Sequence, residues 1–253
     1  MIEVKGLSKR FGDVQVLTDI NAVFAKGQVN QIIGKSGSGK SVLAKCIVGL
    51  HVPEEGEVLY DGRSFHQLDK EAKRGVRQEI GMLFQSSALF DSLSVLENVL
   101  FPLRMFATMP PAEMRERAQL CLKRVNIEGK DHLFPSEISG GMQKRVGIAR
   151  AIAMNPKYLF VDEPNSGLDP QTSIVIDRLI QELTEEYDMT TIVITHDMNS
   201  VMETGQNIVF INQGRMWWNG DRHELLNSDD EELNEFIFAS EMMRQARRAL
   251  AGR

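Results

Sequence analysis

The chain has 253 residues, of which 42% are hydrophobic and 25% are charged. This length is enough for one large domain or two small ones with a sizeable buried core. The formal net charge is -6, and this acidic balance argues against a nucleic-acid-binding protein, which needs clustered lysine and arginine.

Cysteine content and hydropathy bear on the compartment and on contact with a membrane. Cys46 and Cys121 are the only cysteines, and two isolated thiols indicate core packing in a reducing compartment. No apolar run approaches the ~20 residues that span a bilayer. The first residues, Met1 to Lys5, lack the pattern of a signal peptide. A role at a membrane would therefore need a partner that spans it.

The first fifty residues predict β-strands, then a glycine-rich loop, then a helix. The expected strands cover residues 2–5, 21–24 and 29–33, the loop covers 34–41, and the helix covers 43–48. Asn30 and Gln31 make the third strand less apolar than a central parallel strand usually is.

The middle of the chain predicts helices, and the last third alternates strand and helix. The expected helices cover residues 95–103, 112–125 and 141–154, and the later strands cover 158–161, 191–195 and 208–212. Between those strands, one helix carries an apolar stripe of Val175, Ile176, Leu179, Ile180 and Leu183. This alternation predicts an α/β fold with a parallel core, into which the helical middle is inserted.

The C-terminal segment, residues 227–253, predicts a helical extension. Its features are a cap at Ser228, an acidic first turn at 229–232, an apolar stripe of Leu233, Phe236 and Ile237, and a basic end of Arg244, Arg247 and Arg248. That order of charges complements the helix dipole. A solvated helix is the preferred interpretation; packing on the same chain, contact with a second subunit and contact with anionic lipid headgroups stay open.

The strongest motif is the glycine-rich loop, which matches G-x-x-x-x-G-K-[ST] in full. Its glycines let backbone N–H groups curl around phosphate oxygens, and the following helix adds the positive end of its dipole. Lys40 is expected to reach the β- and γ-phosphates, and the Ser41 hydroxyl to bind magnesium. The loop residues expected at the nucleotide are Gly34, Lys35, Ser36, Gly37, Ser38, Gly39, Lys40, Ser41 and Val42.

An acidic pair ends the apolar strand that begins at Tyr158. A carboxylate at the end of such a strand, here Asp162, can hold magnesium beside a phosphate loop. Glu163 follows it and can polarise an attacking water as a general base. A solvated turn is the alternative interpretation, and the phosphate loop in the same chain argues against it.

A second glycine pair precedes the helix expected at 141–154. Ser139 would cap this helix, and Gly140 and Gly141 would leave its N-terminus open to an anion. An ordinary helix cap is the alternative. Arg145 and Arg150 lie further along the same helix and are expected to form a solvated basic face.

Taken in order, these motifs resemble those of the ATPase subunits of ABC transporters. The set consists of the phosphate loop (Walker A), Gln85, the signature Ser139–Gln143, Asp162–Glu163 (Walker B), Ser166–Asp169 and His196. The resemblance implies a P-loop NTPase core of the RecA-like type, with an N-terminal antiparallel β subdomain and an α-helical subdomain inserted at about residues 95–150. The ATPase domain would cover 1–226 and the helical extension 227–253.

The resemblance also implies ATP and Mg²⁺ as ligands and gives a role to each residue. Phe11 would stack on the adenine, Gln85 would contact the metal and the attacking water, His196 would hold the γ-phosphate, and Asp169 would lie at a dimer interface. The catalytic residues would be Glu163, His196 and Gln85, and the metal ligands Ser41, Gln85 and Asp162.

The signature implies a partner. In this family the signature of one subunit covers the ATP of the other, so two copies would close head-to-tail around two ATP molecules. The residues involved would be Ser139, Gly140, Gly141, Met142 and Gln143. Met142 replaces the usual glutamine, and Val42 replaces a frequent threonine; both keep the backbone amide, so we expect altered affinity or rate.

Three segments are similar to the ATPases of the Mla/Mce lipid-transport group: Lys40–Leu43, Phe84–Leu93 and Pro135–Met142. The likeness implies lipid transport between inner and outer membranes, a peripheral position on the cytoplasmic face of the inner membrane, transmembrane permease subunits and an Mce-domain protein. The permease would dock near the segment after Gln85. The apolar side chains there are Leu89, Phe90, Leu93, Val95, Leu96 and Phe101, of which we expect half to belong to the core.

Other functions stay open. An importer of another small solute, such as an amino acid, would carry the same motifs. A soluble ABC-type ATPase acting on ribosomes or DNA is disfavoured, because the chain has one cassette and no sustained heptads. Glu163 and His196 argue against a regulatory module without turnover.

Overall fold

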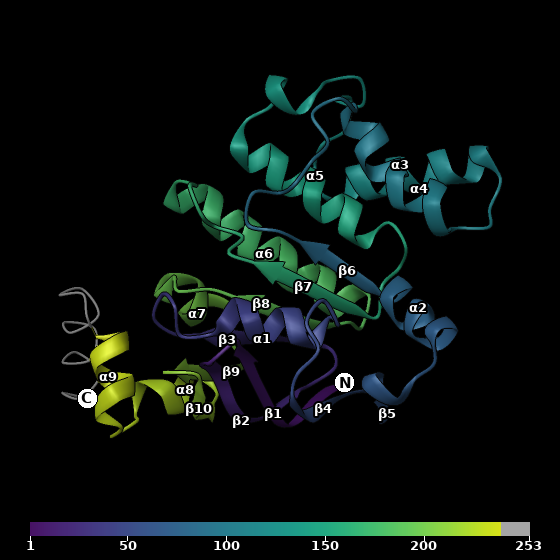
Figure 1. Cartoon of the computed structure of the whole chain (residues 1–253). Helices are drawn as coiled ribbons and strands as arrows, with labels where there is room; N and C mark the ends of the chain where they lie inside the picture. The colour runs from purple at the N-terminus through teal and green to yellow at the C-terminus, as the bar shows by residue number, and fades with distance from the viewer. Residues whose placement is uncertain (239–253) are drawn as a thin grey trace.

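The computed structural model describes residues 1–238, which form two β-sheets covered by helices (Figure 1). The helices α3, α4 and α5 gather at one end of the molecule, and the strands β1, β2 and β4 lie at the other. The larger sheet, between these ends, positions the functional site.

The larger sheet has six strands in the order β10-β9-β3-β8-β7-β6. All neighbours pair in parallel except β10, which runs antiparallel to β9 at the edge. The bounds are β3 Gln28–Ile33, β6 Ile80–Leu83, β7 Tyr158–Asp162, β8 Thr190–Ile194, β9 Asn207–Asn212 and β10 Arg215–Gly220. The α/β class is thus confirmed, while β6 and β10 were not predicted.

The smaller sheet is antiparallel, with four strands in the order β2-β1-β4-β5. Its strands are β1 Ile2–Phe11, β2 Val14–Phe24, β4 Glu55–Tyr60 and β5 Arg63–Ser64. The predicted strands 2–5 and 21–24 were too short. Register shifts interrupt the β1–β2 pairing at several points, and such irregularities break the alternation from which a strand is recognised.

The predicted helical middle is present as α3, α4 and α5. The helices are α1 Lys40–Ile47, α2 Lys70–Gln78, α3 Val95–Phe106, α4 Pro111–Arg124, α5 Gly140–Ile152, α6 Pro170–Glu186, α7 Met198–Thr204, α8 Arg222–Leu226 and α9 Glu231–Ile237, and short 3₁₀ turns cover Phe65–Gln67 and Pro135–Glu137. A capping box between Ser94 and Glu97 starts α3. None of the described helices is long and apolar enough to cross a bilayer.

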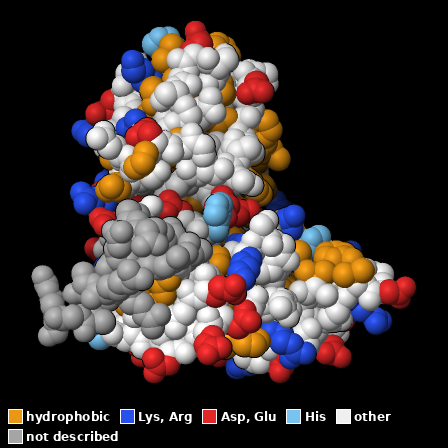
Figure 2. Space-filling view, turned by 90° about the vertical axis from the view of Figure 1, so that its left-hand side faces the viewer, with side chains coloured by type: hydrophobic (Ala, Val, Ile, Leu, Met, Phe, Trp, Pro, Cys, Tyr) orange, Lys and Arg blue, Asp and Glu red, His pale blue; other side chains and the backbone are white. Residues whose placement is uncertain are grey.

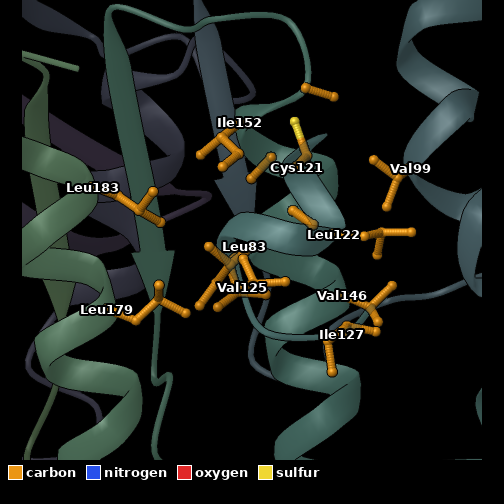
Figure 3. Packing of buried hydrophobic residues seen from close by; sticks show 14 of the residues in the cluster. Leu83, Val99, Cys121, Leu122, Val125, Ile127, Val146, Ile152, Leu179 and Leu183 are labelled. Atoms are coloured by element: carbon orange, nitrogen blue, oxygen red, sulfur yellow. The ribbon is translucent and has the colours of Figure 1, made fainter. Parts of the chain in front are cut away.

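One buried cluster joins the helical middle to the larger sheet (Figure 3). Leu83 of β6, Cys121 of α4, Val146 of α5 and Leu183 of α6 all belong to it and are fully buried. Burial raises the pKa of the Cys121 thiol to about 11, so this cysteine is a core residue, as is Cys46. The shared cluster holds α5, and hence Ser139 before it, in a fixed place relative to the sheet.

The polar side chains of β3 form hydrogen bonds inside the protein, although the buried Gln31 Oε1 has no partner among the described residues. The Asn30 side chain accepts from Ala25 N at 2.8 Å and donates to Thr191 O at 2.9 Å. The Gln31 amide donates to Thr204 Oγ1 at 3.1 Å. Because buried polar groups cost little once they are hydrogen-bonded, the central strand carries Asn30 at little cost, and the hydrogen bonds of the Gln31 amide nitrogen offset part of the cost of burying Gln31.

Two expectations about helices were wrong, one about an apolar stripe and one about a cap. Val175 is 51% exposed, whereas Ile176 beside it is fully buried; successive residues point about 100° apart on a helix, so both cannot face the sheet. In the C-terminal segment Asp230, rather than Ser228, caps the helix and accepts from Leu233 N at 2.8 Å.

The helix α9 buries one face, while Glu231 and Glu235 on it are exposed. Its Leu233 and Ile237 are buried with Phe210 of β9, so the interpretation that it packs on its own chain is correct for the described residues. Arg244, Arg247 and Arg248 lie outside them. The division into residues 1–226 and 227–253 stays a prediction.

Candidate functional site

A cavity of about 960 Å³ opens where β3, β7 and β8 end at their carboxyl ends. Parallel α/β sheets bind ligands at this edge. The predicted site residues that line it are Lys35, Ser36, Gly37, Gly39, Lys40, Ser41, Val42, Gln85, Asp162, Glu163 and His196. Segments far apart in sequence therefore meet as the motifs predict.

The phosphate loop is closely packed against its surroundings. A Cβ atom at Gly34 would lie 2.2 Å from Ile211 O, so no larger residue fits there. The Lys40 ammonium donates to Gly34 O at 2.8 Å and to Lys35 O at 3.0 Å. The buried Ser38 hydroxyl finds no hydrogen-bond partner in the part of the chain that the structure describes.

These features fit a phosphate group. Burial lowers the pKa of Lys40, although the Glu163 and Asp162 carboxylates oppose this effect. Lys40 is 8% exposed, and its ammonium lies against a loop whose successive backbone N–H groups are of the kind that binds anions. The loop, the buried Lys40 ammonium and the Ser38 hydroxyl, which has no partner among the described residues, together form a candidate nucleotide-phosphate site.

The acidic pair lies beside this loop. Burial raises the pKa of Asp162, and the neighbouring Glu163 adds to the effect. The Glu163 backbone has a φ of 47°, a conformation that a non-glycine residue rarely adopts and that is found at functional sites. The Glu163 Oε1 atom lies 2.7 Å from His196 Nδ1. The carboxylate and the imidazole thus form a contact pair in the cavity.

The residues predicted to bind a metal also share the cavity. Ser41, Gln85 and Asp162 offer a hydroxyl, an amide and a carboxylate oxygen, and Mg²⁺ prefers such hard oxygen ligands, usually together with substrate phosphates. The three residues therefore fit Mg²⁺.

Several predicted residues do not line the cavity, among them Gly34 and Ser38 of the loop itself, Phe11 and Asp169. Phe11 is 45% exposed at the end of β1, with its ring 5.2 Å from that of His51. Asp169 caps α6 and accepts from Gln171 N and Thr172 N, each at 3.0 Å. Val16, which the sequence did not single out, lines the cavity instead of Phe11.

The signature residues lie outside their own chain's cavity. Ser139 is exposed and caps α5, accepting from Met142 N at 3.4 Å, so the ordinary-cap interpretation describes its local contact. The Gln143 amide donates to Pro135 O at 2.9 Å. No cavity-lining residue of the described chain comes from Ser139–Gln143.

Lys144, one residue after the signature, was missed by sequence reasoning. It is 5% exposed, and its ammonium donates to Gln85 O and, at 3.3 Å, to Glu163 O. No sequence signal marks it, because its partners are backbone carbonyls of distant segments. Lys144 links the signature helix to two segments of the cavity.

The expected solvated basic face was wrong at Arg150. Its guanidinium donates to Ser87 O and Ala88 O, both at 2.7 Å. This arginine therefore holds the segment after Gln85 rather than facing water. Arg145 donates to Asn126 O at 3.3 Å.

The helix α9 forms one wall of the cavity through Glu235, Phe236 and Ile237. The Glu235 carboxylate pairs with Lys35 of the phosphate loop at 3.3 Å, and the Phe236 ring stacks on Phe210 at 5.2 Å. Figure 2 shows the face that carries α9, where positive and negative side chains are interspersed.

A phosphate loop, an acidic pair and a histidine around one cavity define a nucleotide-hydrolysing protein of the P-loop class. A family profile described as "ABC transporter" matches residues 17–166. The chain belongs to this family as an ATP-binding subunit, an ATPase coupled to transport.

Individual relatives differ in the substrate that they are named for. The intermembrane phospholipid transport system ATP-binding protein MlaF of Haemophilus influenzae is 38% identical, over 94% of this chain and 90% of that protein. The glutamine transport ATP-binding protein GlnQ of Escherichia coli is 41% identical, over 94% of this chain and 98% of that protein. Two other relatives are longer than this chain, which spans 68% of the length of one and 66% of the length of the other.

A solved structure matches the fold with a TM-score of 0.78 and 34% identity, over 87% of this chain and 98% of that one. It is the dimeric post-hydrolysis state of the ATP-binding cassette MJ0796 bound to ADP and Pi. The fold of this chain is therefore similar to that of a cassette whose structure contains ADP and Pi, the products of ATP hydrolysis.

Proposed function

We propose that two copies of this chain hydrolyse Mg²⁺-ATP between them and so drive lipid transport between the inner and outer membranes. The observation that carries the proposal is the pair of Glu163 Oε1 and His196 Nδ1, 2.7 Å apart, in the cavity that Lys40 and Ser41 also line. A base, a cation and hard oxygen ligands around one phosphate loop are the parts that phosphoryl transfer to water requires.

Each residue has a role in this proposal. The loop amides and the Lys40 ammonium bind and orient the phosphates, and Glu163 accepts a proton from the attacking water. His196, held by Glu163, positions the terminal phosphate. Ser41, Gln85 and Asp162 hold Mg²⁺, which neutralises charge that develops on the phosphate oxygens.

The signature residues support a head-to-tail dimer. Ser139 and the open N-terminus of α5 are exposed and outside their own cavity, so a second chain is needed to give them a phosphate. Asp169 is exposed as well and would meet the partner. The dimeric cassette MJ0796 is a precedent for such an assembly.

An apolar groove supports docking on a transmembrane permease. It has a volume of about 630 Å³ and is lined by Phe84, Phe90, Phe101 and Phe106 together with arginines. Phe90 is 42% exposed and its ring lies 4.6 Å from that of Phe101. Val95 and Leu96, in contrast, are buried, so the predicted apolar surface divides between groove and core.

The groove adjoins the catalytic segment. Asn98, fully buried on α3, accepts from Phe90 N at 2.8 Å and donates to Leu93 O at 3.0 Å, and it thereby fixes the loop that begins near Gln85. A permease helix with apolar side chains and an acidic residue would fit the aromatic rings and arginines. Docking would place the ATPase on the cytoplasmic face of the inner membrane.

The lipid assignment is supported by the three segments that resemble the Mla/Mce group and by the match to MlaF over 94% of this chain. An amino-acid importer is the second candidate, because GlnQ is 41% identical. Purification of the tagged chain from detergent-extracted membranes separates the two. Co-purification of a permease with an Mce-domain protein supports lipid transport, whereas an amino-acid permease refutes it.

The test of the site itself is Glu163→Gln. We expect ATP turnover to fall about a thousandfold and an ATP-bound dimer to accumulate, detectable as earlier elution in size exclusion with ATP. Glu182→Gln, an exposed carboxylate that pairs with Arg124 away from the cavity, is the control. Normal hydrolysis by Glu163→Gln would exclude it as the base.

A further inference from the structure

Asp177 on α6 is a buried carboxylate that the proposed function does not use. It is 5% exposed. Its Oδ1 accepts from Asn165 Nδ2 at 3.0 Å and from Ser200 Oγ at 2.9 Å, and its Oδ2 accepts from Asn165 Nδ2 at 2.9 Å. One carboxylate therefore binds two side chains from different segments.

Those two segments carry the catalytic pair. Asn165 lies between Glu163 and Asp169, in the loop that leads from β7 to α6. Ser200 lies on α7, which begins directly after the loop that contains His196. Since Glu163 and His196 meet at 2.7 Å, the two segments are joined twice, once in the cavity and once in the interior.

Burying the Asp177 carboxylate costs free energy, and filling space in the core does not require a carboxylate there. Burial raises the pKa of Asp177 to about 6, and Asp197 and Glu203 on the α7 side act in the same direction against the Asn165 and Ser200 hydrogen bonds. Asn165 also buries an Oδ1 atom without a hydrogen-bond partner among the described residues. Neutral, apolar side chains of similar volume often fill such a site at equal or lower cost.

We propose that Asp177 is a positioning residue, which fixes the Glu163–Asp169 loop against the segment that runs from His196 to Ser200. It thereby holds Glu163 and His196 at the separation that turnover requires, without touching nucleotide. The inference rests on the proposed function, because it takes Glu163 as the base and His196 as the group at the terminal phosphate.

The test cuts the link on either side of Asp177. Asn165→Ala and Ser200→Ala each leave the carboxylate with its other partner, so both variants are expected to fold. Each should lower kcat between about tenfold and a hundredfold, the range that a small misplacement of catalytic groups produces. ATP affinity, measured without turnover, should change less than about twofold.

If Asp177 joins the two segments, the effects of Asn165→Ala and Ser200→Ala on kcat should not be additive. Once either hydrogen bond is removed, the two segments are no longer joined through Asp177. The double variant Asn165→Ala, Ser200→Ala should therefore lose no more kcat than the single variant that has the larger loss. Independent losses that multiply would contradict the proposal. Asp177→Asn, which keeps one acceptor oxygen, should retain more activity than Asp177→Leu, which keeps none.

Thr184→Ala is the matched control. Thr184 is fully buried on the same helix, and its hydroxyl bonds to Ile180 O and to Thr191 Oγ1, both at 2.7 Å, with no bond to either loop. It should lose stability without losing kcat. If Asn165→Ala and Ser200→Ala behave like Thr184→Ala while Glu163→Gln is inactive, the positioning role is refuted and the proposed function stands. If Glu163→Gln hydrolyses normally, the proposed function itself fails.

Discussion

The phosphate loop and the signature segment both place glycines at the N-terminus of a helix, α1 in one case and α5 in the other, but Gly39 begins α1 in a left-handed conformation whereas the Ser139 side chain caps α5. The phosphate loop lies in a cavity with Asp162 and Glu163 around it. Ser139, in contrast, is exposed, and within residues 1–238 its hydroxyl bonds only to its own helix. A glycine-rich helix start thus becomes a candidate site within one chain only where the ends of parallel strands bring the other side chains to it.

The two regions are nevertheless connected inside one chain. Lys144 on the signature helix donates to carbonyl oxygens of Gln85 and Glu163, and the loop from Glu163 to Asp169 runs from the cavity to the exposed side. Changes in the two regions should therefore differ in what they disturb: nucleotide binding in the first, turnover by the assembled dimer in the second.

The largest effect is expected from Lys40→Ala, which removes the buried cation of the phosphate loop. Turnover should fall about a thousandfold or more, because no other described cation has its place beside the loop carbonyls. Steady-state ATPase assays and nucleotide titration measure the loss. Lys26→Ala, which removes an exposed lysine paired with Asp188, is the control. Unchanged turnover in Lys40→Ala would refute the assignment of the loop.

A smaller effect is expected from Ser139→Ala on the signature side. Loss of the cap should cost about 1 kcal/mol of stability, and turnover should fall about tenfold, while ATP binding to the isolated chain stays unchanged. Calorimetric titration and chemical denaturation separate these effects. A loss of ATP affinity equal to that of Lys40→Ala would abolish the distinction between the two regions.

The free energy of unfolding should depend on pH through Asp177, which holds the loop from Glu163 to Asp169. Its folded pKa of about 6 lies above the ordinary value of 3.8, so the native state binds more protons than the unfolded state between these values. The contribution of Asp177 to the free energy of unfolding is therefore largest below about pH 4 and is lost as pH rises to about 6. Asp177→Asn should remove this slope, as urea denaturation at several pH values would show. Parallel curves for the two proteins would contradict the burial of a charge there.

The smallest effect is expected from Glu235→Gln at the cavity wall. The ion pair with Lys35 has side chains that are 72% and 52% exposed, and such pairs contribute at most about 1 kcal/mol. ATP affinity should rise by about twofold or less, because a negative charge leaves the neighbourhood of the phosphates. Glu231→Gln, on the same helix but away from the cavity lining, should have no effect. A tenfold change would mean that α9 controls access to the cavity.

Sequence sufficed where function depends on a local pattern. The phosphate loop, the strand that ends at Asp162 and the Ser139 cap are each specified by neighbours in the chain, and the structure has them where they were predicted. Lys144 and Arg150 could not be predicted as buried, since their partners are carbonyls that only the tertiary fold brings near. The apolar stripe on α9 could be recognised from the sequence, but the surface against which Leu233 packs could not be predicted from it.

The position of α9 gives the molecule an internal optical probe. Trp217 on β10 donates its indole N–H to both carboxylate oxygens of Asp230, at 3.0 and 3.2 Å, and Asp230 is the residue that starts α9. Phe236 and Ile237, further along this helix, form the cavity wall. Any shift of that wall would alter the hydrogen bond of the half-exposed Trp217 indole, so a change in tryptophan emission on addition of nucleotide would report movement of α9 without an added dye.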